Sequence, residues 1–255
     1  MTIRNRHALL AAGGAVLLVA ALTGCGSTDV DDAPVEHKSF AYDGKALTID
    51  AENSVVEVVP ADVDEIEVTR RVDGWVVLGS GPDPVWRLEG DTLTLRVNCK
   101  AMISDCEARH QIKVPRGLAL TVDADNGKVT ASEFTTALKL SSDNGGVVVK
   151  DVSGPLDLKS DNGAIRGERI ASRSLVARSD NGSVDLDLDR VPDLVDTVSD
   201  NGRIAISLPR GSTTYAVSAS SDNGHVSVEV PRSNTSAHVV KARSDNGGVA
   251  VRHGS

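Results

Sequence analysis

The chain has 255 residues, with 27 lysines and arginines against 36 aspartates and glutamates, and a formal net charge of −9 at pH 7. This acidic balance argues against nucleic acid and anionic lipid as partners, because both carry dense negative charge. Aromatic residues make up only 2% of the chain. That is few for a surface that grips sugars by stacking.

Residues 1–24 have the features of an export signal. Arg4 and Arg6 form a basic start, residues 8–22 an apolar core, and the segment Leu22-Thr23-Gly24-Cys25 resembles the bacterial lipobox. We expect cleavage before Cys25 and lipid modification of its thiol, which gives an extracytoplasmic, membrane-anchored protein. The alternative is an ordinary signal peptide with an incidental cysteine. Once both arginines are removed, the remaining chain carries a charge of −11.

The polar residues 25–39 show no apolar period and are predicted to be a flexible tether. Cys99 and Cys106 then remain as the only other cysteines, seven residues apart in an exported chain. A disulfide is the expected pairing. Free thiols, or a metal site that uses the nearby His110, are the alternatives.

From 116 to 255 the sequence repeats a Ser-Asp-Asn-Gly motif, whose first copy has alanine in place of serine. The steps between successive asparagines are 18, 18, 19, 20, 22 and 23 residues, which is typical of a solenoid with one turn of chain per repeat. The repeated asparagines are Asn126, Asn144, Asn162, Asn181, Asn201, Asn223 and Asn246.

Apolar residues with a spacing of two flank each motif, as in Leu156 and Leu158 before Asn162 and Ile165 after it. This pattern predicts strand, turn, strand, and therefore a single-stranded parallel β-helix, with a right-handed coil as the default. Continued parity would place the asparagines inside the corner as a hydrogen-bonded column and the aspartates outside, with glycine supplying an unusual backbone conformation. A meander of Asn-Gly hairpins is the rival interpretation.

Residues 40–115 are predicted to be degenerate, earlier coils with insertions. Asn53 fits the column of a first coil, and Leu93 to Cys99 fit a later one with cysteine in the asparagine position. The distance from Asn53 to Asn126 leaves room for about four coils. Trp75 and Trp86 flank a Gly/Pro-rich loop; we expect them to cover the open end of the core, and a ligand-stacking role is the alternative.

The repeated unit, the Val114-Pro115-Arg116-Gly117 lead-in and the lipobox resemble the bacterial putative-adhesin family of β-strand-repeat proteins, with a DUF4097-type domain. The resemblance covers about residues 40–255. It implies an envelope-exposed β-helix and brings no catalytic residues with it.

The sequence therefore predicts a structural, adhesin-like or protein-interaction module that is not an enzyme and has no cofactor. Its expected partners are the membrane, through the lipid, and an envelope protein or polysaccharide. One alternative is a calcium-binding solenoid, in which a divalent cation bridges the stacked aspartates. A further alternative is a polysaccharide-acting β-helix enzyme, but no catalytic constellation is recognisable in the sequence.

Overall fold

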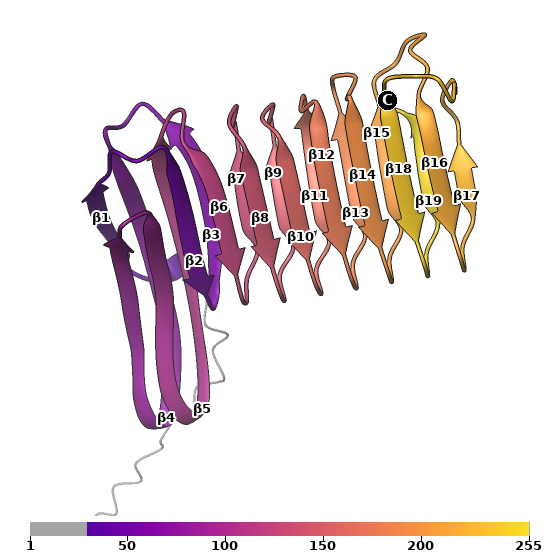
Figure 1. The fold of residues 1–255 in the computed structure, drawn as a ribbon. Coiled ribbons are helices and arrows are strands. Elements are labelled where there is room, and N and C mark those ends of the chain that lie inside the picture. The colour runs from indigo at the N-terminus through magenta and orange to yellow at the C-terminus, as the bar shows by residue number, and fades with distance from the viewer. Residues whose placement is uncertain (1–29, 255) are drawn as a thin grey trace, which may run out of the picture.

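The computed structural model describes residues 30–254, which form an elongated β-solenoid (Figure 1). Nineteen strands join in one hydrogen-bonded network, and the only helical segment within this range is the 3-10 turn η1 (Val30–Asp32). Most strand pairs are parallel, as the period of the repeats predicts. The predicted parallel solenoid is confirmed, and the hairpin meander is wrong for the repeat region.

Each regular coil contributes one strand to each of two facing stacks. In spatial order, the first stack is β2 (Ala46–Glu52), β6 (Ala119–Ala124), β8 (Leu138–Ser142), β10 (Leu156–Ser160), β12 (Ser174–Ser179), β14 (Leu194–Ser199), β18 (Val239–Ser244) and β16 (Ala216–Ser221). The second is β3 (Ser54–Ala61), β7 (Val129–Ser132), β9 (Val147–Lys150), β11 (Ile165–Ile170), β13 (Val184–Leu188), β15 (Ile204–Leu208), β19 (Val249–His253) and β17 (Val226–Val228).

Equivalent positions of successive coils lie directly opposite each other. Leu156 pairs with Leu138 on one side and with Leu175 on the other, and all three are buried. Alternate residues of each strand face the space between the two stacks, so the aliphatic side chains form continuous columns along the solenoid. The core is therefore built from contacts between like residues of neighbouring coils.

The N-terminal region departs from the expected run of about four parallel coils. β5 (Thr92–Pro115) is parallel to both β2 and β3, but β4 (Glu65–Glu89) is antiparallel to β5, and β1 (Val35–Ala41) is antiparallel to β4. In the sequence between β3 and β6, β5 is therefore the only strand that adds a parallel coil. β5 also stacks outside β2 and β3, so the first coil in the sequence is not the first in space.

The register proposed for Cys99 is wrong by two residues. Leu93 pairs with Ile49 rather than with Leu47, which moves Val97 into the position of the column asparagine and Cys99 beyond it. At this corner β4 and β5 do not turn but continue together past the level at which the other coils end (Figure 1). We call this extension, residues 73–83 and 98–107, the tongue.

The described part of the predicted tether, residues 30–39, belongs to the folded domain. Val30 is 4% exposed, and η1 packs against β4 and β5. The Arg71 guanidinium donates a hydrogen bond to the Asp31 carbonyl at 2.6 Å, and β1 pairs with β4 from Val35 onward. Apolar and backbone contacts that composition alone does not reveal therefore fix this segment.

The last two coils are exchanged in space relative to the sequence. β14 pairs with β18, and β18 pairs with β16, while β15 pairs with β19 and β19 with β17. The final coil of the chain is thus inserted in the stack, and the preceding coil forms the end. Val217, Ala219, Val226 and Val228 of that end coil are only partly buried.

A chain that stops after Asn234 should lose order in residues 216–228 as well as the deleted coil. β18 and β19 are the strands that pair with β16 and β17 within the described chain. Hydrogen exchange should show the amides of residues 216–228 unprotected in this truncation. Deletion of residues 209–231 is the matched control, because it removes a coil of similar size and leaves the inserted coil paired with β14 and β15. Protection of residues 216–228 in the truncated chain would contradict the exchanged order.

Candidate functional site

In each coil from β8 onward a serine holds the corner, and it is buried in all of these coils except the end coil, where Ser221 is partly exposed. The first strand of each regular coil ends at this serine, and the following Asp-Asn-Gly forms a bend. The Ser160 hydroxyl donates to the Gly145 carbonyl of the preceding coil at 2.8 Å and accepts from the Gly163 amide of its own coil at 2.8 Å. The serine therefore links adjacent coils and closes its own turn. The equivalent bond to a glycine carbonyl of the neighbouring coil is made by Ser142, Ser179, Ser199, Ser221 and Ser244.

The asparagines form a ladder, but on the outside of the corner. Each side-chain amide donates to the amide oxygen of the asparagine in the adjacent coil, over 2.8 to 3.1 Å, in the order Asn223, Asn246, Asn201, Asn181, Asn162, Asn144, Asn126 and Asn53. All seven asparagines of the repeat are exposed, so their expected inward orientation is wrong. The period-two parity ends with the strand at the serine, and the serine is the last inward residue.

The glycine after each asparagine is needed for close approach between coils. A Cβ atom on Gly145 would lie 1.9 Å from the Gly127 carbonyl oxygen, and one on Gly163 would lie 2.2 Å from that of Gly145. Of the glycines that follow the column asparagines, only Gly127 has a positive φ, at 131°. The expected reason, an unusual backbone conformation, is therefore wrong for the other copies.

The aspartates point outward, and basic residues accompany some of them. The Lys159 ammonium lies 2.8 Å from the Asp161 carboxylate, and the Arg243 guanidinium lies 3.1 Å from Asp245 and 3.9 Å from Asp222. Within residues 30–254 there is no group of three or more His, Cys, Asp or Glu side chains arranged to hold a metal ion. The adjoining face carries a groove with charges of both signs, lined by Asp123, Lys139, Asp157, Lys159 and Arg178 among others.

Replacing Ser160 with alanine should destabilise the fold more than replacing Asn162 with alanine. The Ser160 hydroxyl is buried and makes two hydrogen bonds, so its removal leaves buried groups unpaired, at a cost of about 1–3 kcal/mol. Water can reach the exposed Asn162 site, which limits that loss to about 1 kcal/mol. Chemical denaturation of both variants measures the difference. A larger loss for Asn162→Ala would contradict the assignment of the serine as the buried corner residue.

A buried polar cluster closes the N-terminal part of the core, and the sequence pattern did not identify it. The His110 ring is 0% exposed, and its Nδ1 lies 2.6 Å from the hydroxyl of Ser54, which is also buried. Arg70 pairs with His110 across β4 and β5, and its guanidinium lies 3.7 Å above the centre of the Trp86 ring. Trp86 thus packs against the core as expected, but Trp75 does not. Ser54 and His110 are the residue types of a nucleophile–base pair, but both side chains are buried, so a substrate cannot reach them.

Burial, and secondarily the positive charge of Arg70, lower the pKa of His110 from 6.5 to about 4. The folded state therefore keeps this ring neutral, whereas the unfolded chain protonates it below pH 6.5. The resulting stabilisation is complete above pH 6.5 and decreases as the pH falls toward 4.

Between pH 7 and pH 5 the wild type should lose about 2 kcal/mol of unfolding free energy through His110. His110→Gln cannot titrate and should show a correspondingly flatter pH profile in urea denaturation, whatever its absolute stability. Equal slopes for the two proteins over this range would show that His110 is not held neutral.

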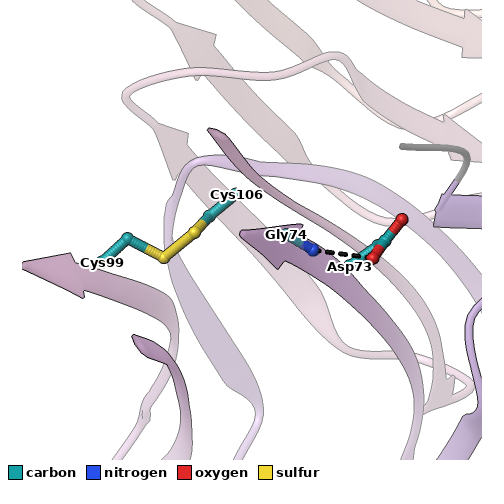
Figure 2. Close-up of a disulfide and its surroundings, with 4 residues drawn as sticks. All are labelled: Asp73, Gly74, Cys99 and Cys106. Carbon is teal, nitrogen blue, oxygen red and sulfur yellow. Dashed lines mark hydrogen bonds between the residues drawn. A yellow bond between two sulfur atoms is a disulfide. The ribbon is translucent and has the colours of Figure 1, made fainter. Parts of the chain in front are cut away.

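The predicted Cys99–Cys106 disulfide is confirmed, with Cα atoms 6.6 Å apart (Figure 2). It connects the outgoing and returning limbs of β5 within the tongue. Two glycines of β4 make room for it. A Cβ atom on Gly74 would lie 2.9 Å from the Cys106 sulfur, and one on Gly81 would lie 3.1 Å from the Cys99 Cα. Gly74 and Gly81 are themselves seven residues apart, which matches the spacing of the two cysteines.

The far end of the tongue exposes large apolar side chains. Leu78 is 82% exposed, Met102 85%, Ile103 59%, and Trp75 and Val77 are each 44% exposed. Val77 lies opposite Ile103 in the β4–β5 register, so the two limbs present one apolar tip. This patch was not anticipated, because an apolar strand end in a sequence gives no sign of whether another layer covers it.

The predicted lipidation site, Cys25, lies outside the described residues. No helix between residues 30 and 254 is long and apolar enough to cross a membrane.

Comparison with known proteins supports the fold. No family model and no curated protein sequence matches the chain. Among solved structures, it is similar to a putative adhesin from Bacteroides fragilis, with a TM-score of 0.53 and 14% identity, over 86% of this chain and 97% of that one. A putative adhesin from Parabacteroides distasonis matches with a TM-score of 0.49 and 11% identity, over 86% and 98% of the two chains. At such identities, the first similarity establishes a shared architecture and not a shared activity.

Proposed function

We propose that this chain is a lipid-anchored protein of the bacterial envelope whose β-solenoid is an adhesin-like interaction module, of the DUF4097 type that its repeats resemble. The observation that carries the proposal is the Cys99–Cys106 disulfide. It agrees with the export signal and lipobox that the sequence predicts for residues 1–25. Structural disulfides persist in oxidising, extracytoplasmic compartments. Attachment through Cys25 then keeps the exported domain at the membrane.

An interaction role, rather than catalysis, is supported by the surface of the solenoid. The groove on the first stack is mostly polar, unlike the enclosed, mostly apolar pockets that hold small substrates. Among the described residues, the one hydrogen bond between a serine and a histidine side chain, that of Ser54 and His110, is buried. A long, rigid face with charges of both signs is suited to an extended partner such as an envelope protein or polysaccharide.

The loops of the last coils offer the most specific contact surface. The loops around residues 189–193, 209–215 and 229–238 lie on the edge opposite the Ser-Asp-Asn-Gly corners, and Figure 1 shows them projecting near the C-terminus. Loops on a rigid scaffold commonly carry recognition. We assign the partner-binding edge to these loops.

Cys25→Ser should release the protein from the membrane fraction, because no acyl chain can then be attached. In the wild type, the N-terminal peptide should begin at Cys25 and carry the mass of the lipid. Cys99→Ser with Cys106→Ser is the control, since it removes the other two thiols and should stay in the membrane fraction. A Cys25→Ser protein that remains membrane-bound with an unchanged N-terminal mass would contradict the anchoring.

Cells that carry the membrane-anchored wild type also allow a test of the interaction role. Cross-linking on intact cells should attach envelope material to the anchored wild type and much less to a variant in which residues 210–213 are replaced by a Gly-Gly linker. Equal cross-linking by both proteins would remove the loop of residues 209–215 from the interaction.

A further inference from the structure

We infer that the apolar tip of the tongue inserts into the interface of the lipid bilayer that carries the protein and so sets the orientation of the solenoid. This inference extends the proposed function, since it requires the N-terminus to lie near a membrane. It concerns residues that the anchoring proposal does not use.

Exposed apolar surface is concentrated at this one place. Within the described residues, six large hydrophobic side chains are exposed, and the tip supplies five of them: Trp75, Val77, Leu78, Met102 and Ile103. The sixth is Val35. An exposed apolar cluster on a soluble domain is typical of a protein or membrane contact. The tip therefore needs a partner that the solenoid itself does not provide.

The charge of the tip differs from that of the rest of the protein. Residues 74–82 and 99–104 contain a single ionisable side chain, Lys100, apart from the disulfide-bonded cysteines. The acidic residues Asp73, Asp83 and Asp105 lie just behind this stretch. A tryptophan and a lysine next to aliphatic residues are the combination found where proteins meet the membrane interface. The overall acidity of the chain, which argues against anionic lipid, thus does not apply to the tip.

The position of the N-terminus selects the bilayer as the occupant. Val30 and Asp31 pack at the base of the tongue, where Asp31 contacts Arg71 and Arg109. Cys25 precedes Val30 by five residues, so its lipid can lie at most about 17 Å from this base. The exposed apolar residues of β4, Trp75 to Leu78, lie four to seven residues along the strand from Arg71, a distance of about 13 to 23 Å in an extended strand. The anchor and the tip can therefore reach the same surface.

The structure of the tongue suits such a contact. The disulfide ties the two limbs of β5, and β4 pairs with β5 on both sides of the tip, so the apolar residues are presented on a braced extension. The tongue leaves the solenoid on the same edge as the Ser-Asp-Asn-Gly corners (Figure 1). With the tip in the bilayer, the long C-terminal loops would face away from the membrane.

The two tryptophans provide a direct test, because one lies at the tip and the other is packed beneath Arg70. The full-length protein is purified from membranes and reconstituted in phosphatidylcholine–phosphatidylglycerol vesicles that carry brominated acyl chains. In Trp86→Phe the remaining Trp75 should be quenched at least about twofold more strongly than the remaining Trp86 of the matched control Trp75→Phe, as expected for a ring at the interface. Leu78→Asp with Met102→Asp, introduced into Trp86→Phe, should abolish this excess quenching.

Equal, weak quenching of both tryptophans in vesicle-bound protein would overturn the inference. So would a tip-dependent dimer, detected by sedimentation, that shields Trp75 from the lipid. If the mass of the N-terminal peptide shows that Cys25 is unmodified, the anchoring proposal fails on its own. The tip is then tested on the chain from residue 26 attached to the same vesicles through an N-terminal hexahistidine tag and a nickel-chelating lipid. Excess Trp75 quenching there would sustain the inference, and its absence would overturn it.

Discussion

The structure depends on the contact between identical corners of neighbouring coils. Parallel strands lie about 4.8 Å apart, and at this spacing the glycine of one corner meets the glycine carbonyl of the next with no room for a Cβ atom. The buried serine hydroxyl uses that same carbonyl as its acceptor. Glycine and serine thus fix the distance and register of the coils, and the aliphatic columns follow because like residues are then placed opposite each other.

This constraint also explains where the solenoid can be interrupted. In the coil formed by β5, the strand does not turn at the corner but continues outward. The buried hydrogen bond between Ser54 and His110 stands there in place of the glycine–serine contact. The tongue is therefore an extended corner and not an insertion between coils. At the other end, the chain exchanges the order of its last two coils without disturbing the corners, because Asn246 and Asn223 remain in one ladder.

The repeat determined most of what could be predicted from the sequence. Residues such as Leu158 and Ile165 recur at the same positions relative to the Asp-Asn-Gly in successive repeats, so the fold class, the core columns and the corner position followed from spacing. The predicted inward orientation of the asparagine side chains is wrong, because the alternation of inward and outward residues ends where the backbone bends after Ser160. The reversed β4, the exchanged coils and the packed Val30 depend on tertiary contacts that no local pattern records. Of the functional features, the disulfide could be predicted because Cys99 and Cys106 are the two cysteines that remain once Cys25 is assigned to the lipid. The apolar tip became visible only when the structure left it uncovered.

Amide hydrogen exchange at the corners, resolved by NMR, is the most direct test of the stacked architecture. The backbone amides of Asn144, Asn162 and Asn181 each donate to an aspartate carbonyl of the preceding coil, at 3.0, 2.9 and 2.8 Å. Although their side chains are exposed, these amides should be protected nearly as strongly as those of the core strands, because they open only when coils separate. Exchange of these three amides as fast as that of a solvated turn would contradict the parallel stack of corners.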